Sequence, residues 1–138
     1  MRPGQQALVD NLLPNLEIQL PAEGAHMDCA GLFDFTPARI WLEVGFGAGE
    51  HLAAQARIHS DTGMIGCEPF LNGTARLLTD IASDGLGNIR IFRDDARLLL
   101  AALPDAIIAA AIVLFPDPWP KLRHHKRRFI SPTNVAEL

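Results

Sequence analysis

The chain has 138 residues, of which 49% are hydrophobic, 12 are Lys or Arg and 16 are Asp or Glu. This length allows one domain with a substantial core, and this composition excludes an intrinsically disordered chain. Five basic residues and no acidic ones lie in the segment 121–128, KLRHHKRR, so the other seven basic and sixteen acidic residues leave a charge of −9. Such a block predicts a localised patch for anions, although a solvated surface loop gives the same charge run.

The segments that would mark export or a membrane anchor are not apparent. The first thirty residues lack the basic head and apolar core of a signal peptide, and the longest apolar run, 106–115, is too short to span a bilayer. Cys29 and Cys67 lie far apart and form no C-x-x-C pair. We therefore expect a cytoplasmic protein with no membrane span, no disulfide framework and no metal site.

Strand-like and helix-like stretches alternate along the chain after an irregular N-terminal stretch, 1–38, which holds one predicted helix around residues 5–13. In chain order the further predicted elements are the strand 39–45, the helix 49–60, the strand 64–68, the helix 71–85, the strand 88–92, the helix 96–104, the strand 106–115 and a last helix that opens at Ser131-Pro132. This order predicts an α/β fold in which helices cover both faces of a parallel sheet. The domain then covers 39–138, and 1–38 is an N-terminal extension.

The turn after the first predicted strand is rich in glycine. Gly45, Gly47 and Gly49 allow a tight turn and a close approach of the backbone to a ligand, although an ordinary strand-to-helix turn also explains them. In the dinucleotide-binding pattern G-x-G-x-x-G, the third glycine would stand where Glu50 does. Glu43 precedes the turn and would repel a pyrophosphate, whereas a cationic ligand would be attracted.

An acidic residue lies at or just after the carboxyl end of each of the four predicted strands, where ligands of parallel sheets bind. The four acids are Glu43, Glu68, Asp95 and Asp117. Like charges gathered in one crevice raise each other's pKa and oppose folding, unless a ligand relieves them. S-adenosylmethionine would do so, because it offers a ribose diol, an adenine amino group, an ammonium and a sulfonium, whereas ATP would add phosphates.

Three residues near these strand ends receive structural interpretations. His51 is interpreted as an ordinary helix residue, and Asp94 as a cap of the helix that begins beside it. Gly73 is expected to weaken the start of its helix.

Four sequence segments carry a resemblance to a known family: LEVGFGAGEHL (42–52), GCEPF (66–70), DDA (94–96) and LFPDPWPKLRHHKRR (114–128). Together they resemble the bacterial tRNA (guanine-N7)-methyltransferases, which use S-adenosylmethionine on a Rossmann-like class I methyltransferase fold. The resemblance covers nearly the whole chain. Its most specific part is the proline-rich segment with the basic block.

The resemblance implies roles for the acids, the glycines and the basic block. The residues expected to bind the cofactor are Glu43, Gly45, Gly47, Glu68, Asp95 and Asp117. Asp117 is also expected to be the active-site acid, and Lys121 to contact the substrate. The residues expected to contact tRNA are Lys121, Arg123, His124, His125, Lys126, Arg127 and Arg128. The two histidines are interpreted as phosphate donors or packing residues, not as metal ligands.

The chemistry of guanine N7 suits this residue set. Its in-plane lone pair is free at neutral pH, so the reaction needs no general base. Methylation leaves a cationic purine, and a carboxylate such as Asp117, between Pro116 and Pro118, favours the charge that develops. Basic residues would neutralise tRNA phosphates.

Two other functions stay open. The tetrapeptide DPWP, 117–120, partly resembles the D-P-P-[YFW] element of methyltransferases that act on amino groups of nucleic acids. Alternatively, the chain is a catalytically inactive RNA-binding domain that has lost the cofactor.

The number of predicted strands also sets an expectation. Class I methyltransferases normally have a seven-stranded sheet, whereas only four strands are predicted before Leu138. We therefore expect a fold truncated after its fourth strand. In the usual order 3-2-1-4, that strand would be an apolar edge, which predicts self-association or marginal stability, and little turnover.

Overall fold

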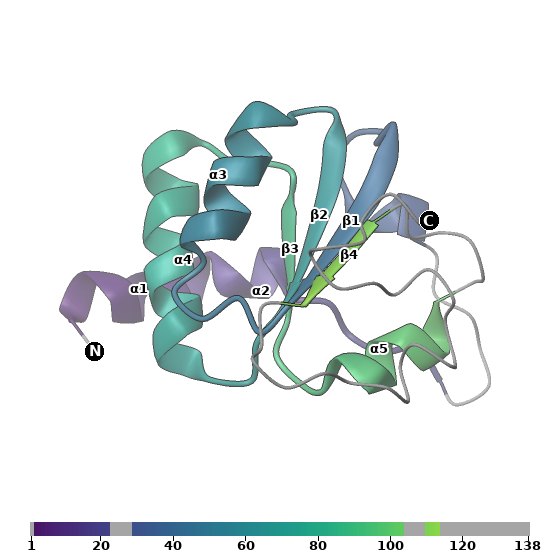
Figure 1. The fold of residues 1–138 in the computed structure, drawn as a ribbon. Coiled ribbons are helices and arrows are strands. Elements are labelled where there is room, and N and C mark those ends of the chain that lie inside the picture. Colours follow the sequence, from purple (N-terminus) through teal and green to yellow (C-terminus); the bar gives the residue numbers. More distant parts are fainter. Residues whose placement is uncertain (1, 23–28, 104–109, 114–138) are drawn as a thin grey trace.

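The computed structural model describes residues 2–22, 29–103 and 110–113 (Figure 1). Its elements are α1 (Pro3–Asn11), α2 (Leu13–Leu16), the 3-10 helix η1 (Cys29–Leu32), β1 (Arg39–Val44), α3 (Glu50–Ile58), β2 (Thr62–Cys67), α4 (Leu71–Asp84), β3 (Ile89–Phe92), α5 (Ala96–Ala102) and β4 (Ala110–Val113). Every helix and strand predicted between residues 39 and 103 is present, with ends that differ by at most two residues. The helix predicted at Ser131-Pro132 lies outside the described residues.

The four strands form one parallel sheet in the order β3-β2-β1-β4. In the register, Leu42 of β1 lies opposite Ile65 of β2 and Ala111 of β4. Figure 1 shows α3 and α4 on one face of the sheet and α5 on the other. The predicted parallel sheet with helices on both faces is therefore confirmed.

Within the described residues, the core consists of two apolar clusters, one on each face of the sheet. Alternate residues of β1, among them Leu42 and Val44, pack with Leu99 of α5. On the opposite face, Leu52 of α3 and Leu77 of α4 cover the strands. Because both faces are covered, the strands are apolar at nearly every position, which is why their sequences resemble continuous apolar runs.

Residues before β1 contribute to both clusters. Leu13 lies in the cluster under α3 and α4, and Phe33 lies in the cluster under α5. Beside β3, Glu17 forms an isolated parallel bridge with Ile91, and the N–H of Ile18 donates to the carbonyl of Ile91 at 2.8 Å. This segment therefore covers part of the outer edge of β3, where unpaired backbone would otherwise be exposed. The predicted domain boundary at 38/39 stays a prediction.

A buried arginine holds the segment around η1 against the sheet. Nε of Arg90, on β3, donates to the carbonyl of Leu32 at 2.6 Å, and Nη1 donates to the carbonyls of Gly87 and Ile89 at 3.1 and 2.7 Å. Its guanidinium also lies 5.2 Å from the centre of the Phe33 ring. The planar fork of arginine allows these contacts to be made together, so one side chain ties residues 32–33 to β3.

Across residues 2–22, 29–103 and 110–113, no helix has the length and apolar character needed to cross a membrane.

Candidate functional site

The glycine-rich loop between β1 and α3 reverses the chain at the carboxyl end of the sheet. Gly45, Gly47 and Gly49 all have positive φ angles, of 71°, 60° and 79°, which residues with a Cβ rarely adopt. The N–H of Gly45 donates to the carbonyl of Cys67 at 2.8 Å, so the loop begins as a continuation of the β1–β2 pairing. The three glycines are therefore required by the path of the backbone.

The first turn of α4 packs directly against this loop. A Cβ atom added at Gly73 would lie 2.0 Å from the carbonyl oxygen of Gly47, well inside van der Waals contact. The sequence indicated only that Gly73 weakens its helix. The structure shows why a glycine is needed there: the loop backbone and the start of α4 meet without space for a side chain.

Glu68, directly after β2, joins the loop to α4. It is buried, with 6% of its surface exposed. Its Oε1 accepts from the N–H of Gly47 at 2.8 Å, and its Oε2 accepts from the N–H of Phe70 at 3.2 Å. A carboxylate has about four acceptor positions, so both oxygens keep a lone pair for a further donor.

Glu43, near the end of β1, is more deeply buried, with 3% of its surface exposed. Its Oε1 lies 2.5 Å from Nδ1 of His51, in the first turn of α3. An ionised carboxylate has no proton to donate, so with Glu43 ionised the imidazole N–H is the donor. Among the described residues, Oε2 has no hydrogen-bond partner. Burial raises the pKa of Glu43, and the hydrogen bond and charge of His51 offset part of this rise.

Asp95, which follows β3, caps α5. Its Oδ1 accepts from the backbone N–H of Arg97 at 2.9 Å, and the Arg97 guanidinium also donates to both carboxylate oxygens. These hydrogen bonds hold the pKa of Asp95 below its usual value. The capping role predicted for Asp94 was wrong: Oδ1 of Asp94 accepts from the N–H of Asp95 at 2.7 Å instead. Helix α5 begins one residue later than that interpretation required.

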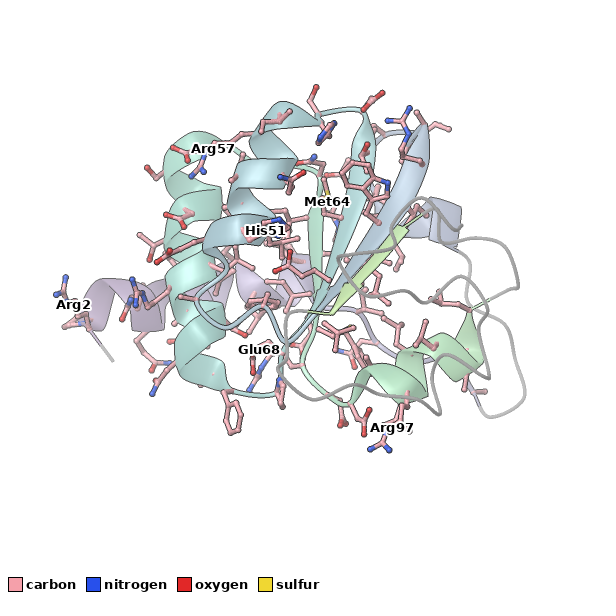
Figure 2. All side chains as sticks on the ribbon, viewed as in Figure 1. Arg2, His51, Arg57, Met64, Glu68 and Arg97 are labelled. Atoms are coloured by element: carbon pink, nitrogen blue, oxygen red, sulfur yellow. The ribbon has the colours of Figure 1, made fainter. Side chains whose placement is uncertain are left out.

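The structure thus brings Glu43, Gly45, Gly47, Glu68 and Asp95 to the carboxyl ends of three neighbouring strands. Figure 2 shows Glu68 beyond these ends, and His51 on the side of α3 that faces the strands. In the described part of the chain, neither Glu43 nor Glu68 forms an ion pair with Lys or Arg. The carboxylates of Glu43 and Glu68 are therefore neutralised by no arginine or lysine in this part, whereas Asp95 is paired with Arg97.

The other predicted site residues lie outside the described residues. They are Asp117, Lys121, Arg123, His124, His125, Lys126, Arg127 and Arg128. Within the described ranges, no group of three His, Cys, Asp or Glu side chains could hold a metal ion.

His51 is the site residue that sequence reasoning missed. The sequence signal that could have identified it is its position, just inside the helix that follows the glycine turn and eight residues after Glu43. At that place a side chain can reach back to the strand end, and a histidine next to a buried acid is a natural hydrogen-bond partner.

A sequence model of the family described as "Putative methyltransferase" matches residues 37–138. Over the whole chain, the sequence is 50% identical to a tRNA (guanine-N(7)-)-methyltransferase of Paramagnetospirillum magneticum and 45% identical to one of Rhodospirillum rubrum. The chain spans 58% and 55% of the lengths of these two relatives.

Two solved structures share the fold. The antibiotic-resistance methyltransferase Kmr matches 70% of this chain and 55% of its own, with a TM-score of 0.51 and 23% identity. A "putative methyltransferase" from Thermoplasma acidophilum matches 68% of this chain and 40% of its own, with a TM-score of 0.53 and 21% identity. At such identities the likeness concerns the fold alone, and it agrees with the predicted Rossmann-like arrangement.

Proposed function

Since the chain belongs to the methyltransferase family whose model matches residues 37–138, we propose that it is the cofactor-binding part of a cytoplasmic tRNA (guanine-N7)-methyltransferase that uses S-adenosylmethionine. The observation that carries this proposal is the pair of buried carboxylates, Glu43 and Glu68, on either side of the glycine loop. The relatives that match the whole chain at 45–50% identity are named for this reaction.

The residues present fit S-adenosylmethionine. Oε2 of Glu43 is buried without a partner among the described residues, and an ammonium donor would satisfy it. Glu68 keeps acceptor positions for the two ribose hydroxyls. Asp95, at the end of β3, would accept from the adenine amino group only after Arg97 releases one of its oxygens, because both accept from Arg97 here. A Cβ built at Gly47 would meet nothing within 4 Å, so the loop leaves space beside its backbone. A ligand rich in phosphate would be repelled by the same carboxylates.

The bound cofactor supplies an electrophilic methyl group, and the chain's own residues bind and orient the two reactants. Glu43, Glu68 and Asp95 hold the two ends and the ribose of the cofactor. Asp117 is assigned from its motif to the reacting centre, where its charge favours the cationic purine that methylation of N7 produces. No side chain has to remove a proton from the nucleophile.

The basic block supplies the RNA contacts in this proposal. Lys121 and the segment 123–128 would neutralise tRNA phosphates, which position the substrate without reading its sequence. The rest of the chain carries a charge of −9, since seven basic and sixteen acidic residues remain. Phosphate contact is therefore expected to concentrate at this block.

The first test is calorimetry with S-adenosylmethionine on the chain and on Glu68→Ala. Loss of a hydrogen bond to a charged group is expected to weaken binding by about 1.5–3 kcal/mol. Unchanged affinity in the variant would remove Glu68 from the cofactor site. A chain that binds tRNA but not the cofactor would favour the inactive RNA-binding domain.

The second test identifies the product. The chain is incubated with tRNA and isotopically labelled S-adenosylmethionine, and the RNA is digested to nucleosides. The proposal expects 7-methylguanosine. A nucleoside methylated on an exocyclic amine would instead support the amino-group methyltransferase.

A further inference from the structure

His51 differs from an ordinary residue on a helix surface, because it contacts the buried carboxylate of Glu43. His51 is half-exposed, with 43% of its side chain accessible, yet its Nδ1 lies 2.5 Å from an oxygen of a carboxylate that is almost wholly buried. The two residues come from β1 and α3, on the two sides of the glycine loop. The hydrogen bond therefore ties the start of the helix to the end of the strand across that loop.

The uncharged surroundings of Glu43 make the hydrogen bond with His51 important for its carboxylate. A small cavity beside Glu43 is lined by Trp41, Leu42, Leu52, Gln55 and Met64, none of which is charged. Its volume of about 10 Å³ is at the lower limit for a single water molecule. A buried ionised carboxylate without a partner is costly, so the imidazole N–H is the group that compensates Oε1.

The two oxygens of Glu43 are consequently unequal. Oε1 is held by His51, whereas Oε2 has no partner among the described residues. A carboxylate fixed at one oxygen cannot rotate freely about its terminal bond, so its second oxygen keeps one direction. Pre-orientation of this kind reduces the free energy spent on ordering when a ligand binds.

We propose that His51 is a positioning residue: by holding Oε1 of Glu43, it keeps Oε2 directed to accept a hydrogen bond from the ammonium group of the cofactor's amino-acid end. His51 itself does not touch the cofactor. This inference rests on the proposed function, because the ammonium belongs to S-adenosylmethionine.

The test compares two ligands that differ at that end. S-adenosylhomocysteine carries the amino-acid end, whereas 5′-methylthioadenosine has the same adenine, ribose and sulfur without it. His51→Leu removes the donor, and His51→Asn keeps an N–H at the place of Nδ1 in a side chain of similar shape to leucine. Calorimetry gives the affinity of the parent chain and both variants for both ligands.

In His51→Leu, the affinity for S-adenosylhomocysteine is expected to fall about tenfold or more, the factor for one net hydrogen bond. Its affinity for 5′-methylthioadenosine should stay within about twofold, since that ligand has no ammonium. In His51→Asn, both affinities should stay within about threefold of the parent. A change that merely loosened the fold would weaken both ligands together.

Two matched controls come from the same part of the chain. Ile58→Ala, on the exposed end of α3, should alter neither affinity. Glu68→Gln should weaken both ligands, because both carry the ribose. If His51→Leu does not fold, His51→Ala replaces it, since alanine also lacks a side-chain donor and should show the same selective loss.

The outcomes separate the two proposals. A parent chain that binds neither ligand would overturn the proposed function and this inference with it. A parent that binds both ligands, combined with a donor-free variant that loses both or neither, would overturn the inference alone. Selective loss of S-adenosylhomocysteine, restored by His51→Asn, supports it.

Discussion

At the level of single residues, the buried carboxylate of Glu43 lowers the stability of the folded chain, whereas the proposed function uses it to bind the cofactor. Its carboxyl has a higher pKa in the folded chain than its ordinary value of 4.5, because burial disfavours the charged form more than His51 favours it. Between these two values the folded chain binds more protons than the unfolded chain. The free energy of unfolding therefore falls as the pH rises through this window, and the loss is complete above the folded pKa.

Glu43→Gln should remove this pH dependence. Glutamine keeps an acceptor for His51 and carries no charge, so the variant should gain stability relative to the parent as the pH rises from about 4 to 7. It should bind S-adenosylmethionine about tenfold more weakly, because a neutral acceptor replaces a charged one. Urea unfolding at several pH values and calorimetry measure the two effects.

Glu50→Gln is the matched control, since the side chain of Glu50 is 82% exposed and lies at the start of the same helix. Its pH dependence should follow that of the parent. A difference between parent and Glu43→Gln that is constant from pH 4 to 7 would contradict the role given to burial.

The residues around Glu43 and His51 show how much of the candidate site could be predicted from the sequence. The glycines and Glu68 were predictable, because strand ends and turn glycines have local signals. The contact of His51 with Glu43 depends on how far α3 is rotated about its axis. Packing of Leu52, Ala53 and Ala56 against the sheet fixes that rotation, and no short stretch of sequence contains it.

At the level of elements, the site depends on how closely α4 approaches the glycine loop. Gly73→Ala would place a Cβ 2.0 Å from the Gly47 carbonyl, so the helix or the loop has to move. We expect a loss of about 1–3 kcal/mol in the free energy of unfolding, as for other overpacked sites, together with weaker cofactor binding.

Gly4→Ala serves as the comparison, because Gly4 also lies in the first turn of a helix and a Cβ there meets nothing within 4 Å. This change should be neutral or stabilise the chain by up to about 1 kcal/mol, through helix propensity alone. Equal effects of the two substitutions in urea unfolding would show that the close approach at Gly73 is unimportant.

The elements from 39 to 103 were predicted from apolar runs and from Gly85 and Pro104, whose signals are local. The role of the residues before position 39 was not predicted. Leu13 lies at the end of the helix predicted around residues 5–13, but Leu13, Leu16 and Ile18 become buried only through contact with residues far along the chain. Non-local packing of this kind leaves little trace in a sequence window.

Leu13→Ala tests whether this stretch belongs to the folded core. Leu13 is 3% exposed, so its truncation should lower the free energy of unfolding by about 2–5 kcal/mol. Leu20, which is 41% exposed, provides the paired substitution, and Leu20→Ala should stay within about 0.5 kcal/mol of the parent. Chemical denaturation of both variants measures the two changes in the free energy of unfolding. A stable Leu13→Ala variant would make residues 2–22 a dispensable extension.

At the level of the whole molecule, charge is divided between an acidic body and the basic block 121–128. Replacement of Arg127 and Arg128 by alanine should weaken tRNA binding and flatten its dependence on salt, by roughly one unit of slope for each phosphate that is no longer neutralised. Cofactor affinity should stay constant. Filter binding or anisotropy at several salt concentrations gives the slope.

A control for net charge replaces Arg2 and Arg76, which lie outside the block, by alanine. This pair removes the same charge, so it should leave the slope close to that of the parent if phosphate binding is local. If both double variants change the slope equally, the block acts only through the charge of the whole protein.

The bridge between Glu17 and Ile91 also has a consequence for the order of events during synthesis. Its two residues are 74 positions apart, so at about 5–20 residues per second the ribosome needs roughly 4–15 s to deliver the second after the first. During that interval Leu13 and Leu16 have none of their β3 neighbours to pack against. The stretch that holds Leu13 and Leu16 must therefore wait for β3 before it can be buried, and over those seconds its apolar side chains are available to chaperones.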